Sequence, residues 1–512
     1  MNTTREKTIQ TTLCKLVEDL VAIPNIAEID RPITGVKLDS RLVKNGDLFI
    51  ACFGRNHDAR NYIDQAIISG CAAVVAEFTA GMQELKTIGS IPVIGIENLS
   101  SKVSQIANRF YQYPSSELKI VGITGTNGKT SCSQFIADAL QSLGYKCGMM
   151  GTLGSGQPGS LEPSVLTTPD PVFSQKQLAR MVNERFEYVA MEVSSVGLDQ
   201  KRVEAIDFDT AVFTNLTRDH LDYHKTMEEY AESKRKLFKW PTLKSAILNL
   251  DDEFALSLIN SVSKEVEIVT YSLSNHHASV FSEGLTFSSN GYSMIVNTPF
   301  GVTELSGKIL GRFNISNILA VIATLISLLS REGKGHIDLV EILDKVSSLD
   351  SVDGRMEIVN DAGEVTTIVD YAHTPDSLRC ALKSLRHHFK GKIWCVFGCG
   401  GNRDEGKRPL MGEIAESFAD CLVVTDDNPR TEDGDRIVSQ ILSGVRKPQN
   451  VSVIRDREQA IKYAISNASL KDLVFIAGKG HETYQEVSGI KTCFSDKAHA
   501  RLALKARGNT RR

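Results

Sequence analysis

The sequence predicts an α/β protein of three domains, and three observations support this prediction. The chain has 512 residues, which is more than a single hydrophobic core usually organises. Apolar runs rich in β-branched residues alternate with stretches of helical spacing. Several of these runs end in polar clusters, as parallel strands do when ligand-binding loops follow their carboxyl ends. We place the three domains at residues 1–114, 115–350 and 351–512.

The first domain is predicted to be a small α/β unit. It contains apolar runs at residues 72–76 and 91–96, and residues 101–111 have the spacing of a helix. The run Tyr-Pro-Ser-Ser at residues 113–116 has the composition of a linker and is expected to end the domain.

The second domain opens with the most informative segment of the chain, residues 119–130. An apolar strand ends at a glycine-rich turn, and a Lys-Thr pair then opens a helix. Gly125 and Gly128 allow a bend that turns backbone N–H groups toward an anion, while Lys129 can reach phosphates and Thr130 can ligate Mg²⁺. The usual Gly-x-x-x-x-Gly-Lys-Thr pattern is incomplete, because Ile123 stands in place of its first glycine. We still predict a nucleoside triphosphate site; the alternative is a strand–turn–helix corner without a ligand.

Three further segments of the second domain carry charged residues. Glu192 ends an apolar strand and suits an Mg²⁺ ligand, although a strand-end carboxylate can also simply face solvent. His220 lies beside two aspartates and could ligate a second cation, whereas a structural role suits the nearby His224. Lys234 lies in a stretch whose composition predicts a solvated helix with i,i+4 ion pairs. Residues 266–310 are expected to form short antiparallel strands, and residues 318–329 a buried helix.

The third domain is predicted to be a Rossmann-like, doubly wound parallel sheet. Four apolar strands in it each end in a polar cluster. Arg403 and Arg430 lie in two of these clusters and could form bidentate pairs with carboxylates, and Glu482 in another could hold an ammonium. The set suits an amino acid with an extra charged group. The alternative is a set of exposed loop salt bridges, which are common.

The bulk composition excludes other classes of protein. The net charge of −4 gives no general basic footprint for nucleic acid. The ten cysteines are scattered without a Cys-x-x-Cys pair, which favours a reduced, cytoplasmic compartment. The first ten residues lack the apolar stretch of a signal peptide, and the longest apolar segment is too short to span a bilayer. We expect a cytoplasmic monomer with small-molecule substrates as its partners, without nucleic acid or membrane insertion.

The motifs together resemble the Mur ligase family over nearly the whole chain. The resemblance rests on Gly-Thr-Asn-Gly-Lys-Thr at 125–130, Met-Glu-Val-Ser-Ser at 191–195, Asn-Leu-Thr-Arg-Asp-His-Leu-Asp-Tyr-His at 215–224, Gly-Arg-Phe-Asn at 311–314, Asp-Tyr-Ala-His-Thr-Pro at 370–375 and Asp-Asn-Pro-Arg at 427–430. The missing first glycine of the phosphate loop is normal in this family. The resemblance implies an ATP-dependent ligase of peptidoglycan synthesis that forms an amide through an acyl phosphate. Its cofactors would be ATP, Mg²⁺ and a CO₂-derived carbamate on Lys234 that helps to ligate the metal.

The resemblance also implies the residues of each subsite. The catalytic residues would be Lys129, Lys234 and His220. The metal ligands would be Thr130, Glu192, His220 and the carbamate of Lys234. The ATP-binding residues would be Gly125, Thr126, Asn127, Gly128, Lys129, Thr130, Asn314, Arg355, Asp370 and His373. The residues that hold the UDP-N-acetylmuramoyl peptide would be Leu38, Ser40, Arg55, Asn56, His57, Asn127, Thr167, Thr168, Ser194, Gln200 and Arg202.

The Asp-Asn-Pro-Arg run resembles that of members of the family that add meso-diaminopimelate to UDP-N-acetylmuramoyl-L-alanyl-D-glutamate. Lysine-adding relatives typically lack its arginine. The residues implied for diaminopimelate are Arg403, Asp427, Asn428, Pro429, Arg430, Gly478 and Glu482. The alternatives are a lysine-adding member, another Mur or folylpolyglutamate-type ligase, and a non-catalytic nucleotide-binding homologue.

Overall fold

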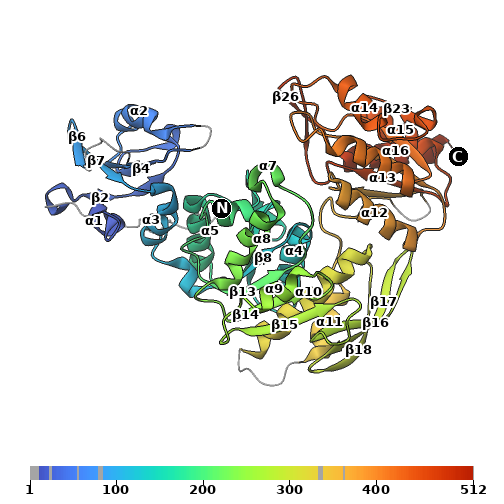
Figure 1. The fold of residues 1–512 in the computed structure, drawn as a ribbon, viewed down its shortest axis with the longest axis horizontal. Helices are drawn as coiled ribbons and strands as arrows, with labels where there is room; N and C mark the ends of the chain where they lie inside the picture. The colour runs from blue at the N-terminus through green and yellow to red at the C-terminus, as the bar shows by residue number, and fades with distance from the viewer. Residues whose placement is uncertain are drawn as a thin grey trace.

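The computed structural model describes residues 11–21, 26–54, 57–78, 85–331, 338–360 and 364–510. Three main sheets follow one another along the chain, and each lies within one of the three predicted domains. The central domain lies between the other two, with the N-terminal domain in blue on one side and the C-terminal domain in orange and red on the other (Figure 1). The α/β prediction is confirmed.

The N-terminal domain is a five-stranded sheet in the order β3-β4-β5-β7-β6, in which only β6 is antiparallel to its neighbour. Its strands are β3 (Gly35–Lys37), β4 (Asp47–Ala51), β5 (Ala73–Glu77), β6 (Leu85–Ile88) and β7 (Ile91–Ile96), and a separate pair is β1 (Thr11–Thr12) and β2 (Pro32–Ile33). Its helices are α1 (Leu13–Val17), α2 (Ile63–Ile68) and α3 (Val103–Phe110). The helix predicted at 101–111 is α3, preceded by a 3₁₀ turn at Leu99–Ser101.

The predicted linker at 113–116 is more ordered than its composition suggested. Residues Pro114–Glu117 form a 3₁₀ turn, in which Pro114 and Ser115 are buried. The proline fixes the backbone angle that the first position of the turn needs. The Ser115 hydroxyl donates to Asp207 of the central domain at 3.1 Å, so this segment is attached to the domain that follows it.

The central domain is one sheet of eleven strands in the order β11-β10-β9-β12-β8-β13-β14-β15-β16-β17-β18. The strands are β8 (Lys119–Thr124), β9 (Cys147–Gly151), β10 (Gly154–Gln157), β11 (Ser160–Glu162), β12 (Tyr188–Glu192), β13 (Phe208–Phe213), β14 (Ser245–Asn249), β15 (Glu267–Ser272), β16 (Val280–Ser288), β17 (Gly291–Thr298) and β18 (Gly301–Gly307). The helices are α4 (Lys129–Ser142), α5 (Pro171–Asn183), α6 (Ser195–Asp199), α7 (Leu221–His224), α8 (Met227–Arg235), α9 (Phe254–Ile259), α10 (Arg312–Ser330) and α11 (Leu339–Ser347).

The register of the central strands places the candidate residues at one edge. In the parallel pairing, Glu192 at the end of β12 lies opposite Ile123, and Phe213 at the end of β13 lies opposite Thr124. The loops after β8, β12 and β13 therefore leave the sheet at the same edge, as expected for ligand-binding loops of a parallel sheet.

The antiparallel region predicted at 266–310 is only partly antiparallel. Strand β15 pairs in parallel with β14, and β16 begins in parallel with β15, while β16, β17 and β18 form an antiparallel meander. The meander continues the main sheet, so it is not a separate subsheet. The predicted buried helix is α10, and most of its apolar residues lie in the central core. It is long and apolar enough to cross a bilayer, but 78% of the relevant window is buried within the protein.

The C-terminal domain is a six-stranded sheet in the order β19-β20-β24-β21-β22-β23, with only β19 antiparallel. The strands are β19 (Glu357–Ile358), β20 (Thr366–Asp370), β21 (Ile393–Phe397), β22 (Cys421–Val424), β23 (Val451–Val453) and β24 (Leu473–Ala477), with a hairpin of β25 (Tyr484–Val487) and β26 (Ile490–Cys493). The helices are α12 (Pro375–His388), α13 (Lys407–Phe418), α14 (Gly434–Leu442), α15 (Arg457–Asn467) and α16 (Asp496–Thr510).

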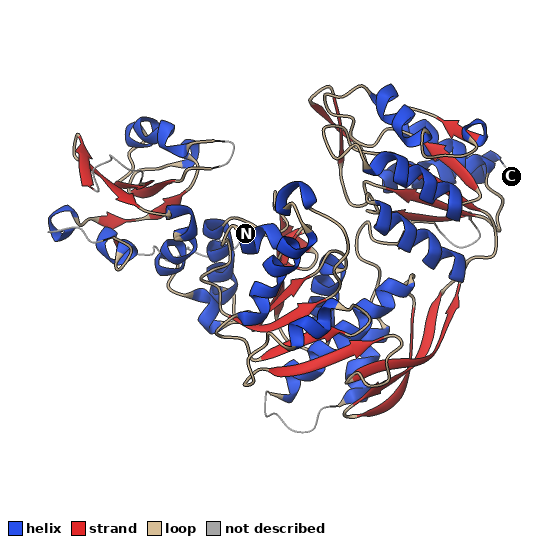
Figure 2. Cartoon of the chain, viewed as in Figure 1, coloured by secondary structure: helices blue, strands red, loops and turns tan. Residues whose placement is uncertain are grey.

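The C-terminal sheet is doubly wound, as predicted. Helices α12, α13 and α14 contribute to one apolar cluster, and α15 and α16 contribute to a second one. Figure 2 shows these helices around the red strands of the sheet. Strands β19 and β23 are short, with two and three residues, and the sequence analysis did not find them.

Candidate active site

A cleft of about 520 Å³ brings together residues of the central and C-terminal domains. The central domain contributes the loop after β8, the ends of β12 and β13, and the start of α10. The C-terminal domain contributes Arg355 and the segment that joins β20 to α12. Most of the residues predicted for ATP line this cleft: Thr126, Asn127, Gly128, Lys129, Thr130, Arg355, Asp370 and His373.

The glycine-rich loop after β8 is closely packed against its surroundings. Gly128 has a φ of +90° just before α4, a conformation that L side chains rarely adopt. A Cβ atom at Gly125 would lie 1.9 Å from Thr214 Oγ1, so only glycine fits there. The Lys129 ammonium donates to the carbonyl oxygens of Gly125 and Thr126 at 2.8 and 2.9 Å, and burial lowers its pKa.

Glu192 lies buried beside the start of α4. Its Oε2 accepts from the Thr130 hydroxyl at 2.9 Å, and its Oε1 accepts from the Thr152 backbone N–H at 2.7 Å. Burial raises the pKa of this carboxyl, and the Lys129 charge opposes that rise. The interpretation of Glu192 as a solvent-facing strand end is therefore wrong, and the structure brings its carboxylate to the hydroxyl of Thr130 as the metal prediction requires.

His220 and Lys234 both lie close to the Tyr230 ring. His220 lines the cleft, and its ring centroid is 6.0 Å from that of Tyr230. The Lys234 Nζ lies 4.3 Å from the centre of the same ring, and the Tyr230 hydroxyl lies 3.1 Å from Thr126 Oγ1 of the phosphate loop. His224 instead pairs its Nε2 with the Ser195 hydroxyl at 2.9 Å and is buried, as the structural interpretation predicted.

The helix that carries Lys234 is not simply solvated, which corrects the prediction from composition. Tyr230, Ser233 and Lys234 of α8 are buried, and Lys234 is only 1% exposed. Within the described residues no hydrogen bond joins its Nζ to another group. Burial and the nearby Lys129 charge lower the pKa of Lys234 well below its usual value, which favours the neutral amine. Composition could not reveal this, because it does not show which face of α8 packs against the domain.

On the C-terminal side of the cleft, Arg355 reaches across to the central domain. Its Nη2 donates to Thr130 Oγ1 at 3.5 Å, and its guanidinium lies 4.3 Å from the centre of the Tyr371 ring. Asp370 accepts backbone N–H groups from Met356 and Ala372 at 2.7 and 2.8 Å, which fixes the start of this segment.

The structure does not bring Asn314 to the cleft. Its Nδ2 donates to the Leu310 carbonyl at 2.8 Å, its Oδ1 accepts from Asn317 at 3.1 Å, and the residue is buried. Phe313 and Asn317 of the same helix line the cleft instead. The sequence analysis named neither Phe313 nor Asn317 as a site residue. For Asn317 a signal existed, because its i,i+3 spacing from Asn314 on a helix predicts that the two side chains are neighbours.

The residues predicted for the UDP-N-acetylmuramoyl peptide fall into two groups. In the central domain, Thr168 donates to the Glu192 carbonyl and to Ser194 Oγ at 2.9 and 3.0 Å, and Arg202 donates to Gln200 and to the Thr168 carbonyl. Thr167 lines the cleft and accepts from Thr152 at 3.1 Å.

The second group lies in the N-terminal domain and does not line the cleft. Ser40 is buried and donates to Gln65 of α2 at 2.9 Å, while Leu38 is half-buried and His57 is exposed. Arg55 and Asn56 lie outside the described residues.

The residues predicted for diaminopimelate surround the loops after β21, β22 and β24. A Cβ atom at Gly400 would lie 3.0 Å from Arg430 Nη1 and 3.6 Å from Arg403 Cγ, so the two arginines flank this glycine. The Arg430 Nη1 donates to the Gly401 carbonyl at 2.7 Å. Burial raises the pKa of Asp427, and a Cβ at Gly478 would lie 2.4 Å from its Oδ2. Pro429 precedes Arg430, whose φ is +54°.

Asn428 and Glu482 are in direct contact. The Asn428 side-chain amide donates to Glu482 Oε2 at 2.9 Å. The two residues are 54 positions apart in the sequence, and the loops at the carboxyl ends of β22 and β24 bring them together. This contact brings two of the residues implied for diaminopimelate together.

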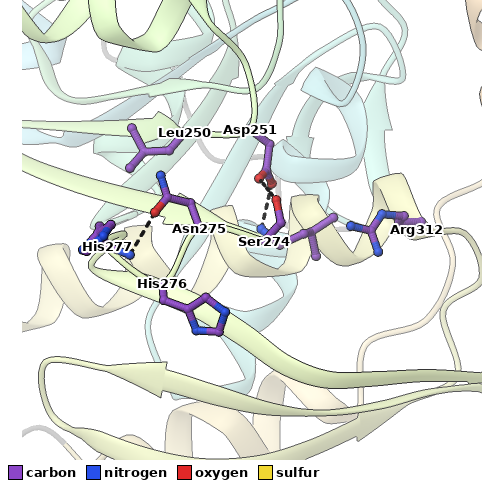
Figure 3. Close-up of a pocket in the computed structure, with 8 residues that line it drawn as sticks. Leu250, Asp251, Ser274, Asn275, His276, His277 and Arg312 are labelled. Atoms are coloured by element: carbon purple, nitrogen blue, oxygen red, sulfur yellow. Dashed lines mark hydrogen bonds between the residues drawn. The ribbon is translucent and has the colours of Figure 1, made fainter.

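A second pocket, of about 590 Å³, opens at the ends of β14 and β15 and is lined by none of the predicted site residues. Figure 3 shows the hydrogen bonds from Ser274 to Asp251 and from the His277 backbone N–H to Asn275, with Arg312 of α10 at one side. The hydrogen bonds of Asp251 to Ser272, Leu273 and Ser274 hold the loop after β15.

Comparison with known proteins agrees with this geometry. The model of the Mur ligase middle domain matches residues 123–325, and that of the Mur ligase, glutamate ligase domain matches residues 354–480. A relative from Pseudomonas putida named UDP-N-acetylmuramoyl-L-alanyl-D-glutamate--2,6-diaminopimelate ligase is 45% identical over 487 residues, which cover 94% of this chain and 96% of the relative. A relative of the same name from Coxiella burnetii is 44% identical over 92% of this chain and 96% of its own.

Solved structures show the same fold. A structure of UDP-N-acetylmuramoyl-L-alanyl-D-glutamate--2,6-diaminopimelate ligase matches with a TM-score of 0.68 and 34% identity, over 98% of this chain and 99% of the other. A MurF structure from Acinetobacter baumannii matches with a TM-score of 0.66 at 17% identity, over 98% of this chain and 99% of its own, and shares the fold. Since the family models and the relatives together cover most of the sequence, the chain belongs to the Mur ligase family.

Proposed function

We propose that this protein is an ATP-dependent ligase that adds meso-2,6-diaminopimelate to UDP-N-acetylmuramoyl-L-alanyl-D-glutamate in peptidoglycan synthesis. The observation that carries the proposal is the cleft, in which a phosphate loop and a buried carboxylate of one domain face Arg355 and Asp370 of the next. Relatives with this printed name cover nearly the whole chain at 42 to 45% identity. Within the part of the chain that the structure describes the cysteines form no disulfide, which suits a reduced cytoplasm.

ATP would lie on the phosphate loop, in the cleft that Phe313 and Asn317 also line. The loop N–H groups, the N-terminus of α4 and the Lys129 ammonium all favour negative charge there. The two carbonyl oxygens that Lys129 contacts would compete only weakly with phosphate oxygens for its ammonium, because a charged acceptor forms the stronger hydrogen bond. Lys129 is therefore the residue whose ammonium would bind the oxygens of the phosphoryl group during its transfer.

The residues beside the loop fit Mg²⁺. The Thr130 hydroxyl and the Glu192 carboxylate lie 2.9 Å apart, and hard oxygen donors of this kind are the ligands that Mg²⁺ prefers. Bound there, Mg²⁺ would neutralise charge on the β- and γ-phosphates. His220 lines the same cleft and is a candidate for a second cation. Burial lowers the pKa of His220 and keeps its imidazole neutral, as a metal ligand must be.

Lys234 is proposed to carry a carbamate. A lysine adds CO₂ only as the neutral amine, and the buried position of Lys234 favours that form. The product would be an anion beside the Lys129 charge, where the unmodified ammonium is disfavoured. It would lie near His220 and complete the oxygen donors of the metal site.

The reaction would proceed in two displacements. The γ-carboxylate of the D-glutamyl residue attacks the γ-phosphorus of ATP, the bond to ADP breaks, and an acyl phosphate forms. The amine of diaminopimelate then attacks the acyl carbon, a proton leaves the amine, and inorganic phosphate departs from the tetrahedral intermediate. The protein supplies positioning and charge stabilisation, and the two domains that line the cleft exclude water from the acyl phosphate.

Diaminopimelate would bind at the loops that carry Arg403, Arg430, Asn428 and Glu482. Its distal head has a carboxylate and an ammonium, which match the two guanidinium groups and the Glu482 carboxylate. L-Lysine offers only the ammonium, so Arg430 is the residue that favours diaminopimelate over the lysine-adding alternative.

The test is product analysis with purified protein, ATP, Mg²⁺ and the UDP-muramoyl dipeptide. We expect ADP, phosphate and a nucleotide heavier by one diaminopimelate residue, formed only when all substrates are present. Nucleotide binding without any amino-acid-dependent product would instead favour a non-catalytic homologue.

A further inference from the structure

Lys479 is a fully buried lysine next to the candidate amino-acid site, and none of the functional assignments above uses it. It lies in the turn after β24, and its side chain is 0% exposed. Its Nζ donates to Asn428 Oδ1 at 3.0 Å and to Glu482 Oε2 at 2.9 Å. Both acceptors belong to the set proposed for diaminopimelate, and they come from two different strand-end loops.

The three side chains form a closed triangle. The Asn428 Nδ2 donates to the same Glu482 Oε2, and Asn428 Oδ1 also accepts from the Glu486 backbone N–H at 2.9 Å. Both the nitrogen and the oxygen of the Asn428 amide are thus hydrogen-bonded, and these bonds fix the orientation of the amide.

The triangle leaves one oxygen of Glu482 available. Both hydrogen bonds to this carboxylate reach Oε2, and within the described residues none reaches Oε1. The side chain is 19% exposed, so a ligand can approach it. Burial opposes ionisation of Glu482, but the Lys479 charge and the hydrogen bonds from Lys479 and Asn428 together lower its pKa, which keeps the carboxylate ionised.

A purely structural role explains this lysine poorly. Burying an ammonium is costly, and packing alone would favour an apolar side chain. The same domain already has a buried pair that holds its loops together, since Arg457 donates to Asp496 at 2.7 and 2.8 Å and to the Ala477 carbonyl at 3.0 Å. Lys479 instead contacts two residues of the set proposed for diaminopimelate.

We infer that Lys479 is a positioning residue for the amino-acid substrate: by holding Asn428 and Glu482 Oε2 it directs Glu482 Oε1 toward the ammonium of the distal head of diaminopimelate. This inference rests on the proposed function and deepens it. Lys479 does not touch the reacting atoms and acts through Glu482. Its removal should therefore weaken binding of the amino acid and leave the nucleotide site unchanged.

The experiment compares steady-state kinetics of the wild type with Lys479→Met, Glu482→Gln and the double variant, with Lys462→Met on the exposed side of α15 as matched control. We expect Lys479→Met to raise KM for diaminopimelate by about 10- to 100-fold, the range for loss of a hydrogen bond to a charged group. The KM for ATP should stay within about twofold and kcat within about threefold, and Lys462→Met should behave as the wild type. Because Lys479 acts through Glu482, the double variant should be no worse than the poorer single variant.

Three results would overturn the inference: an unchanged KM for diaminopimelate, a parallel rise in KM for all three substrates, or additive effects in the double variant. If Lys479→Met does not fold, as thermal unfolding will show, Lys479→Gln keeps a hydrogen-bond donor without the charge and is judged by the same criteria. A wild type that shows no diaminopimelate-dependent turnover would refute the proposed function itself, which separates the two failures.

Discussion

Lys129 donates hydrogen bonds to two carbonyl oxygens of its own loop, so these contacts tie it to no other element of the fold. We predict that Lys129→Ala lowers kcat by at least about 100-fold, because it removes a cation from the transferring phosphoryl group. Far-ultraviolet circular dichroism should be unchanged. Lys176→Ala, on the exposed face of α5, serves as the control. Activity of Lys129→Ala within a few-fold of the wild type would contradict the assignment of the phosphate loop.

Lys234 has a buried neighbourhood that the next lysine along the chain lacks. Lys236 forms an ion pair with Asp199 at 3.3 Å, and its side chain is 45% exposed. With ¹³C-labelled bicarbonate, we expect the wild type and Lys236→Arg to show a carbamate carbon signal and Lys234→Arg to lack it. Turnover should fall in CO₂-depleted buffer and return on addition of bicarbonate. A carbamate signal that survives in Lys234→Arg would refute this site.

At the scale of elements, helix α12 is attached to the central domain through His388. Its Nε2 accepts from the Gly311 N–H at 2.9 Å, and its Nδ1 lies 2.7 Å from the Ser288 carbonyl. A backbone N–H only donates and a carbonyl only accepts, so the imidazole must be neutral with its proton on Nδ1. Gly311 immediately precedes α10, which lines the cleft, so this histidine connects the two domains next to the nucleotide site.

Acidification should weaken this connection. Burial lowers the pKa of His388 below its ordinary value of about 6.5, so the unfolded chain binds the proton more readily than the folded one. The stability that His388 contributes is therefore complete above pH 6.5 and is lost as the pH falls below it. We predict that His388→Asn lowers the unfolding free energy by about 1–3 kcal/mol at pH 7.5 and reduces its decline between pH 7 and pH 5.

Chemical denaturation at several pH values measures this effect. The adjacent His387 is exposed and is the matched control, because His387→Asn changes a ring on the same helix without this pair of hydrogen bonds. An equal pH dependence in the wild type and His388→Asn would show that the histidine does not titrate as described.

The sequence predicted elements better than it predicted contacts. The phosphate loop, the strand before Glu192 and the four main strands of the third domain were found, because apolar runs that end at glycine or polar clusters are local signals. Composition misjudged α8, since burial of Lys234 depends on what packs over the helix. The short strand β23 carries too few residues to show a period.

At the scale of the whole molecule, the site depends on distant segments that meet. Arg355 reaches Thr130 across 225 positions, and Lys479 reaches Asn428 across 51. Neither pairing leaves a local pattern in one sequence. Only the family resemblance placed Arg355 at the nucleotide, and neither motif nor resemblance marked Lys479. Asn314 shows the opposite case, because a residue carried over from the resemblance packs against Leu310 and Asn317 and does not line the cleft.

The residues of the N-terminal domain that are predicted to hold the UDP-muramoyl peptide lie apart from the cleft. Ser40 and Leu38 lie in a domain of their own, so the long UDP-muramoyl peptide would bridge two domains. We predict that Arg202→Ala raises KM for this substrate by about tenfold with KM for ATP unchanged, because Arg202 anchors the Thr168–Gln200 cluster beside the cleft. Steady-state kinetics with each substrate varied in turn gives the answer, and an equal rise in both KM values would contradict it.

The most direct test of the central claim is phosphate release by the wild type with ATP, Mg²⁺ and UDP-N-acetylmuramoyl-L-alanyl-D-glutamate, with meso-diaminopimelate compared against L-lysine. We predict release that depends on the dipeptide and on diaminopimelate, with L-lysine giving little. Release with L-lysine alone would show that Arg430 does not select the substrate. Release that occurs when both amino acids are left out would contradict the ligase assignment. So would the absence of any release with either amino acid.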